Sequence, residues 1–163
     1  MIETQRLELI PLTPEFLKLW VENLEGLEKE MNCSYQGEPL EGYLLAIVKS
    51  QLDQVQRDPE NYLWYSVWLL IRNTDRVVVG SAAFKNTPDL DGEVEIGYGL
   101  GKAFEHNGYM TEAVKAMCDW ALKQRMIAHV IAETYLNGFA SQRILKRCGF
   151  KEVRRENTIW WRL

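Results

Sequence analysis

The chain has 163 residues, of which 47% are hydrophobic and 26% are charged, and its formal net charge is −4. This length is enough for one domain, spanning residues 1–163, that buries its own core, and the composition excludes disordered and fibrous proteins. The acidic balance argues against a nucleic-acid partner, because such partners are usually bound by a basic face.

The expected compartment is the cytoplasm. The first residues, "MIETQRLELIPL", lack the apolar core of a signal peptide, and no apolar run approaches the roughly 20 residues of a membrane span. Three cysteines, Cys33, Cys118 and Cys148, are widely spaced without a CxxC motif, which predicts reduced, buried or half-buried thiols. With two histidines, the chain offers no pattern for a metal site. We therefore expect a cytoplasmic protein with no metal, no membrane partner and no nucleic-acid partner.

The first part of the chain predicts one strand and two helices. Residues 6–12 alternate apolar and polar side chains and end near a proline, as a short strand does. A helix is predicted over residues 14–31, with Thr13 as its N-cap, Pro14 at its first position and apolar residues at helical spacing. After a break, a second helix is predicted over residues 42–57.

The second part predicts a sheet interrupted by two helices. Residues 62–71 and 76–85 are rich in β-branched and aromatic side chains, and the turn "RNTD" between them indicates an antiparallel hairpin. The remaining elements are, in order, a strand over 93–100, a helix over 109–124, a strand over 129–134, a helix over 140–148 and a last strand over 158–163. Helices that cross over late in the chain imply a mixed sheet with helices on its faces.

The stretch "FEHNGYMTEA", residues 104–113, joins a predicted strand to a predicted helix. The first N–H groups of a helix have no intrahelical partner and carry the positive end of its dipole, so they bind an anion without any basic side chain. Gly108 permits the positive φ or close approach that such a loop requires. The stretch matches neither the P-loop nor the dinucleotide fingerprint, and alone it also suits a plain strand–helix connection.

Three motifs give this stretch a context. They are Glu95–Ile96–Gly97–Tyr98; then Gly108–Tyr109 with Thr111–Glu112–Ala113; then Asn137, Ser141, Lys146, Gly149 and Phe150. In this order and spacing, and with the opening "IETQRLELIPLT", the chain resembles the GNAT superfamily of N-acetyltransferases over nearly its whole length. The most similar branch includes the ribosomal-protein alanine acetyltransferases (RimJ/RimL-like). The resemblance implies a mixed α/β fold, with a mostly antiparallel sheet of about six or seven strands, one splayed parallel pair and about four flanking helices.

The resemblance also implies acetyl-CoA as co-substrate, bound where strand 93–100 diverges from strand 129–134. The implied cofactor-binding residues are Tyr98, Gly99 and Leu100 along pantetheine, Glu105, His106, Asn107, Gly108, Tyr109, Met110 and Thr111 around the pyrophosphate, and Asn137 on the cofactor arm. Glu105 stands where the family usually has Gln or Arg, and Met110 where it has a small residue. Both departures predict weakened cofactor binding. The Glu105 carboxylate repels a diphosphate, and the large Met110 makes the backbone of the next turn less closely approachable.

Direct acetyl transfer requires a neutral amine, a polarised thioester oxygen and a proton for the leaving thiolate. In this family a strand glutamate takes the proton of the amine, and Glu95 occupies that position. Glu93 lies two residues earlier on the same strand face and is its rival. Many relatives protonate the thiolate with a tyrosine where this chain has Leu145, so Ser141 is the predicted substitute. Tyr98, Tyr109 and Tyr135 are weaker candidates.

The acceptor predicted by the resemblance is a primary amine, either a small molecule or a protein N-terminus. Residues 14–60 contain ten acidic and four basic side chains, which suits a cationic acceptor but also a merely solvated surface. The basic stretch "KRCGFKEVRR" is either a contact for a CoA phosphate or a solvated helix end. A monomer or a homodimer fits the chain. The alternative function is a weak or silent CoA-binding regulatory module, since Glu105, Met110 and the missing tyrosine depart from the family pattern.

Overall fold

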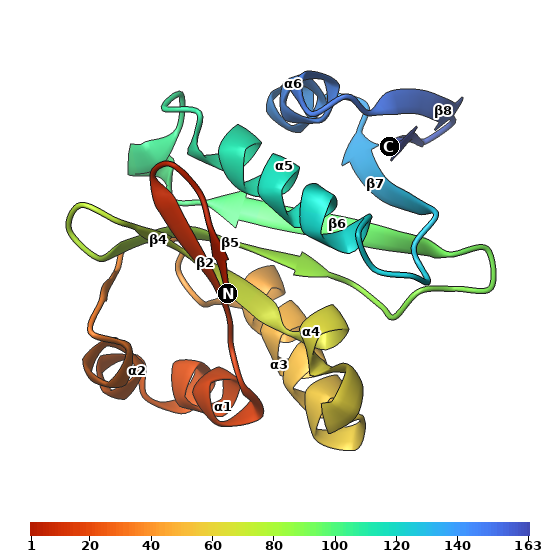
Figure 1. Cartoon of the computed structure of the whole chain (residues 1–163). Helices are drawn as coiled ribbons and strands as arrows, with labels where there is room; N and C mark the ends of the chain where they lie inside the picture. Colours follow the sequence, from red (N-terminus) through yellow and green to blue (C-terminus); the bar gives the residue numbers. More distant parts are fainter.

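A nine-stranded mixed sheet forms the centre of the computed structural model, which describes residues 1–163 (Figure 1). The order of its strands is β1-β2-β4-β5-β6-β7-β9-β8, and β3, which lies outside this order, pairs in parallel with β5. The strands are β1 (Ile2–Glu3), β2 (Leu7–Pro11), β3 (Ser34–Tyr35), β4 (Val67–Arg72), β5 (Val77–Phe84), β6 (Glu93–Leu100), β7 (His129–Tyr135), β8 (Lys151–Arg155) and β9 (Thr158–Arg162). The α-helices are α1 (Pro14–Glu22), α2 (Leu24–Met31), α3 (Gly42–Arg57), α4 (Tyr62–Tyr65), α5 (Tyr109–Ala121) and α6 (Phe139–Arg147).

The strands β4, β5 and β6 form the predicted antiparallel meander. β6 is also parallel to β7, but the two strands pair only from Glu93 to Glu95 on β6. From Ile96 to Leu100, β6 pairs with β5 alone, while β7 continues along β9. The predicted mixed fold with one splayed parallel pair is thereby confirmed, although the structure has more strands and more helices than expected, and the short β3 adds a second parallel pair with β5.

Helices cover both faces of the sheet (Figure 1). One core, under α5, contains β2 residues Leu7 and Leu9 together with Met117 and Trp161. The second core, under α1 and α3, contains Leu17, Trp20 and Val48. The strands β4 and β5 contribute side chains to both cores, one from each face. β4 is buried from Val67 to Ile71 because both of its faces carry a core. Such two-sided burial explains its nearly continuous apolar sequence.

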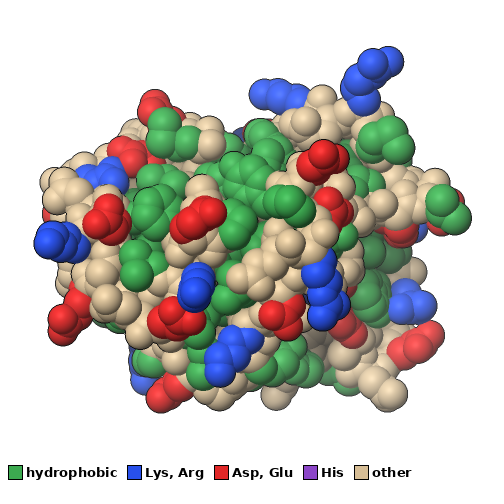
Figure 2. Space-filling view, turned by 90° about the horizontal axis from the view of Figure 1, so that it is seen from below, with side chains coloured by type: hydrophobic (Ala, Val, Ile, Leu, Met, Phe, Trp, Pro, Cys, Tyr) green, Lys and Arg blue, Asp and Glu red, His purple; other side chains and the backbone are tan.

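Figure 2 shows the face that carries α1–α4. Apolar side chains gather toward its centre, and acidic side chains are interspersed with basic ones around them. The excess of acidic residues predicted for residues 14–60 therefore forms no continuous patch on this face.

Two predicted elements differ markedly from the observed ones, while the others agree to within three residues at each end. The single helix predicted over residues 14–31 breaks at Asn23, whose extended backbone (φ −155°) ends α1 and whose side chain accepts from the Gly26 N–H to cap α2. The strand predicted from Tyr62 begins at Val67, because residues 62–65 form α4. Aromatic residues in "YLWY" favour strands, but here tertiary packing overrides that preference, with Trp64 against Phe84 and Trp120.

Three strands were not predicted, namely β1, β3 and β8. β1 and β3 have two residues each and are too short for a periodic pattern. Every residue of β8 is exposed, so its sequence "KEVRR" lacks the alternation that marks a half-buried strand. In β9 the two tryptophans point to opposite faces: Trp161 is buried in the core, and Trp160 lies under the Arg154 guanidinium.

The three cysteines are free, with Cys118 buried and the other two half-buried, as predicted. None of the helices combines the length and apolar character that crossing a membrane would require. No group of three or more His, Cys, Asp or Glu side chains could hold a metal ion.

Candidate functional site

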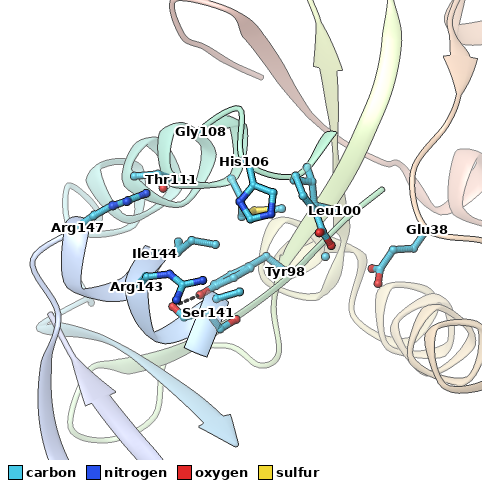
Figure 3. A pocket seen from close by; sticks show the side chains of 14 residues that line it. Glu38, Tyr98, Leu100, His106, Gly108, Thr111, Ser141, Arg143, Ile144 and Arg147 are labelled. Carbon is cyan, nitrogen blue, oxygen red and sulfur yellow. Dashed lines mark hydrogen bonds between the residues drawn. The ribbon is translucent and has the colours of Figure 1, made fainter. Parts of the chain in front are cut away.

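A cavity of about 380 Å³ opens where β6 and β7 diverge. Its walls are β6, the loop that leads into α5, and one side of α6 (Figure 3). The facing edges of β6 (residues 96–100) and β7 (residues 132–135) have no strand partner in the gap. An extended chain that enters the gap can therefore pair with β6 as an added strand. We call this the donor cavity.

Most of the predicted cofactor residues surround the donor cavity. Those that line it are Tyr98, Gly99, Leu100, Glu105, His106, Gly108, Met110 and Thr111, together with the predicted Ser141. Asn107, Tyr109 and Asn137 do not line it. Asn137 is exposed in the turn before α6. Tyr109 instead packs against the Arg6 guanidinium, 4.6 Å from its ring centre.

The loop before α5 presents a row of free backbone amides. The N–H groups of residues 106–111 donate to no acceptor within the protein, since the first helical bond runs from Glu112 N–H to the Gly108 carbonyl. Gly108 adopts φ 78° and His106 φ 63°, so both lie in the left-handed region that turns successive amides toward one point. No side chain caps this helix start. The amides and the helix dipole are both available to an anion.

Glu105 and Met110 are accommodated at this loop. The Glu105 carbonyl accepts a hydrogen bond from the Asn107 side chain at 2.9 Å, which fixes the backbone, while its side chain is exposed. The Met110 side chain is 3% exposed and belongs to the core under α5. The larger residue at position 110 therefore fills the core beneath the helix, and the backbone above it stays accessible.

Two arginines on α6 supply positive charge to the donor cavity. Arg143 and Arg147 lie four residues apart, so they project from the same side of the helix and line the cavity (Figure 3). Of the predicted basic stretch 146–155, only Arg147 lines it. Arg143 was not predicted, although its spacing from Arg147 on a predicted helix was a usable signal. Both side chains can bind phosphate in a bidentate manner.

Tyr98 and Ser141 meet at the inner end of the donor cavity. The Tyr98 hydroxyl donates to the Ser141 backbone carbonyl at 3.4 Å, and both residues line the cavity (Figure 3). Burial raises the pKa of Tyr98 to about 12, and the contact with Ser141 only partly offsets this effect. The phenol therefore keeps its proton at neutral pH.

Glu93 and Glu95, the predicted base candidates, line neither this cavity nor the next one. The Glu95 carboxylate forms an ion pair with the Lys85 ammonium, and its side chain is only 15% exposed. The Glu93 carboxylate pairs with the Arg162 guanidinium at 2.7 Å. A carboxylate held by a cation must give up or share that contact before it binds an amine.

A second cavity, of about 630 Å³, lies on the opposite face of the sheet, beneath α3. Its floor consists of small residues on β5 and β6, including Ser81, Ala83 and Gly97. Its wall includes Leu44 and Ile47 of α3. Because no large side chain rises from this floor, the space between the sheet and α3 stays open. We call this the acceptor cavity.

The two cavities share Glu38, Tyr98, Gly99, Leu100 and Glu105. They therefore open onto the same short segment of β6 from its two faces. A group bound along β6 in the donor cavity can be reached by a molecule in the acceptor cavity. This arrangement suits a transfer between two bound molecules.

Gly101 lets the loop that carries Glu38 pack against the end of β6. Its φ of −58° suits any residue, but a Cβ there would overlap the Gln36 carbonyl and lie 3.1 Å from Phe104. We expect Gly101→Ala to lower the free energy of unfolding by about 1–3 kcal/mol, because a backbone atom cannot move aside as a side chain does. Urea unfolding measures this difference.

The matched control is Gly97→Ala, whose Cβ would meet no atom closer than the Lys85 Cε at 3.6 Å. We expect this variant to be as stable as the wild type. Equal stability of the two alanine variants would contradict the proposed role of Gly101.

Glu112, from the motif "TEA", holds the start of α5 against the N-terminal strands. Its carboxylate accepts from the Thr4 hydroxyl at 2.7 Å, from the Arg6 N–H at 2.8 Å and from the Arg6 guanidinium at 2.7 Å. Arg6 also donates to the Asn107 carbonyl at 2.9 Å. Burial alone would raise the pKa of Glu112, but the hydrogen bonds from Thr4 and Arg6 outweigh it and lower the pKa. Glu112 therefore supports the anion-facing loop from behind.

We expect Glu112→Gln to destabilise the protein by about 1–3 kcal/mol at pH 7, because it removes charge-assisted hydrogen bonds. A carboxyl with a lowered folded pKa stabilises the fold above its unfolded pKa of about 4.3, and this contribution is lost as the pH falls through the folded pKa. The difference between wild type and variant should therefore shrink below about pH 4. Denaturant unfolding at several pH values measures it, and a difference that is independent of pH would contradict the assignment.

Comparison with known families matches residues 6–151 to the family described as "Acetyltransferase (GNAT) domain". Among curated proteins, the chain is similar to the uncharacterised N-acetyltransferase YjdG of Bacillus subtilis (strain 168), with 28% identity over 86 residues. That alignment covers 53% of this chain and 51% of the relative, so the match spans about half the length of each.

Solved structures share the fold at low sequence identity. One is RimL, a ribosomal-protein α-N-acetyltransferase in complex with coenzyme A, with 12% identity, a TM-score of 0.69, and coverage of 98% of this chain and 94% of that chain. Another is a ribosomal-protein-S5-alanine acetyltransferase from Vibrio fischeri, with 14% identity, a TM-score of 0.69 and coverage of 99% and 94%. A GNAT-family acetyltransferase from Bacillus anthracis has 14% identity, a TM-score of 0.64 and coverage of 99% and 96%.

Proposed function

Because the chain belongs to the GNAT acetyltransferase family, we propose that it transfers the acetyl group of acetyl-CoA to a primary amine. The observation that carries the proposal is the junction of the two cavities on residues 98–100 of β6. The free edge of β6 pairs with the pantetheine arm, as an added strand does. The amides of residues 106–111 bind the pyrophosphate, and Arg143 and Arg147 bind a further phosphate of CoA.

The chemistry requires proton transfers at two atoms. The amine nitrogen attacks the thioester carbon and loses a proton, and the thiolate of CoA gains one as the carbon–sulfur bond breaks. Tyr98 is the proposed donor to the thiolate, because its hydroxyl lies in the donor cavity and burial keeps it protonated. Ser141 is the rival, because it lines the same cavity. The resemblance assigns the removal of the proton from the amine nitrogen to Glu95 or Glu93.

The acceptor is either a small-molecule amine or a protein N-terminus. Both present a primary amine that reaches the thioester from the acceptor cavity. The three free cysteines suit a reducing compartment, so a cytoplasmic location is part of the proposal.

Binding and turnover test the proposal in sequence. Acetyl-CoA should raise the melting temperature of the purified protein, and at 100 times its Kd the stabilisation should be about 2.7 kcal/mol. Free thiol should then be released in the presence of a panel of amines and peptides, with the acetylated product identified by mass. No thermal shift at millimolar acetyl-CoA would contradict the donor site. Binding without thiol release from any acceptor would favour a silent CoA-binding module.

A further inference from the structure

Glu38 borders both cavities, in the loop between β3 and α3. Its carboxylate lies directly over Gly99 of β6, at the place where a Cβ would otherwise be. Figure 3 shows it approaching the donor cavity from the side opposite to α6. The carboxylate has no ion-pair partner and accepts no hydrogen bond within the protein. Glu38 is therefore a free carboxylate beside the segment of β6 where the thioester is expected.

The backbone around Glu38 is held in place from several sides. β3 pairs with β5, and the Gln36 N–H continues this ladder by donating to the Val78 carbonyl at 3.0 Å. The Tyr35 hydroxyl donates to the Glu38 carbonyl at 2.7 Å. Gly99 and Gly101 leave room for the loop against β6. The position of the backbone that carries Glu38 thus results from the fold, and the exposed side chain extends from it over Gly99.

The other carboxylates near the site are ion-paired, lie beside the pyrophosphate loop or border a single cavity. Glu41 borders the acceptor cavity but not the donor cavity. Glu93 and Glu95 are ion-paired and line neither cavity. Glu105 borders both cavities, but it immediately precedes the amides proposed for the pyrophosphate. Burial raises the pKa of the Glu38 carboxyl, which brings it closer to the operating range of a general base.

The acceptor cavity indicates the kind of molecule that reaches Glu38. Its walls include the apolar side chains of Leu44, Ile47 and Val67, and its rim includes Tyr43, which is 80% exposed. Such a surface buries an apolar body, while the Glu38 carboxylate on its border attracts a cation.

We propose that Glu38 binds the ammonium group of the acceptor and takes the proton that the nitrogen loses, and that the acceptor is a small primary amine on an apolar body. This inference rests on the acetyl transfer proposed above. It replaces the strand glutamates in the role of base.

The step balances without a further reactant. The ammonium first passes one proton to Glu38, which returns it to solvent. The nitrogen–carbon bond then forms, the carbon–sulfur bond breaks, and Glu38 takes the second proton from the nitrogen. Tyr98 protonates the thiolate and regains a proton from Glu38 through water. The products are the acetamide and CoA with a free thiol.

Two matched acceptors separate this role from a structural one. Phenylethylamine is a cation at neutral pH, whereas benzyloxyamine has nearly the same shape but is neutral and weakly basic. We expect Glu38→Gln to lower kcat/KM for phenylethylamine by about 10²-fold or more. The loss with benzyloxyamine should be at least about tenfold smaller, because a neutral, weakly basic nitrogen depends less on a carboxylate. Glu30→Gln, which changes an exposed carboxylate of α2 outside both cavities, should match the wild type.

The outcomes distinguish this inference from the proposed function. Equal losses with the two acceptors, or full activity of Glu38→Gln, would overturn the role of Glu38 and leave acetyl transfer standing. Loss in Glu95→Gln without loss in Glu38→Gln would return the role to the strand. Wild-type activity on peptide N-termini alone, with neither small amine acetylated, would overturn the acceptor class. Failure of calorimetry to detect acetyl-CoA binding would overturn both proposals together.

Discussion

Tyr98→Phe should lower kcat by about 10²-fold and leave the Kd for acetyl-CoA unchanged. The phenol hydroxyl lies in the donor cavity, and partial burial raises the pKa of Tyr98 to about 12, which keeps it protonated until the thiolate forms. A serine hydroxyl is a much weaker acid, so proton transfer from Ser141 to the thiolate is less favourable. The phenylalanine ring keeps the packing against the core under α5, where Tyr98 is partly buried.

Ser141→Ala is the comparison for this prediction, because both hydroxyls face the same cavity. We expect it to retain most of the wild-type kcat. Pre-steady-state measurement of thiol release separates the chemical step from product release. Full activity of Tyr98→Phe, or a larger loss in Ser141→Ala, would assign the proton donor to Ser141 as the family resemblance predicts.

Replacing both Arg143 and Arg147 with alanine should raise the Kd for acetyl-CoA by about 10²-fold or more. Each charge-assisted hydrogen bond to a phosphate contributes about 1.5–3 kcal/mol, and 1.4 kcal/mol corresponds to a factor of ten in affinity. Both side chains are exposed, so their removal should leave the fold intact. Isothermal titration calorimetry measures the Kd directly.

The control for the effect of net charge on affinity is the double variant Lys151→Ala and Arg154→Ala. These residues of β8 belong to the same basic stretch but line neither cavity. The control should bind acetyl-CoA as the wild type does at moderate salt, since distant surface charges are screened. If the two double variants lose the same affinity, the arginines act through net charge and not by contact.

Local patterns were sufficient for the elements that build the donor cavity. The strand over residues 93–100 was predicted with its observed bounds, because buried Val94 and Ile96 alternate with half-buried neighbours after a turn. The start of α5 at Tyr109 followed from Gly108 and the apolar spacing behind it. The cavity residues between 98 and 111 lie close together in the chain, so a motif of a few residues describes most of the wall that they form.

The acceptor side could not be predicted in the same way. Glu38 lies in "QGEPLEG", whose turn residues show no periodic pattern. Its position depends on β3 pairing with β5 and on the approach of the loop to Gly99 and Gly101, far along the chain. The ion pair of Glu95 with Lys85 depends in turn on the register between β5 and β6. Contacts of this kind follow from tertiary structure, and no local pattern encodes them.

A crystal structure of the protein with acetyl-CoA would locate the donor and its thioester. We expect the pantetheine arm along residues 98–100 of β6, the pyrophosphate on the amides of residues 106–111, and the thioester within reach of both Tyr98 and Glu38. A CoA molecule bound elsewhere on the sheet, or one whose thioester is shielded from the acceptor cavity, would contradict this expectation.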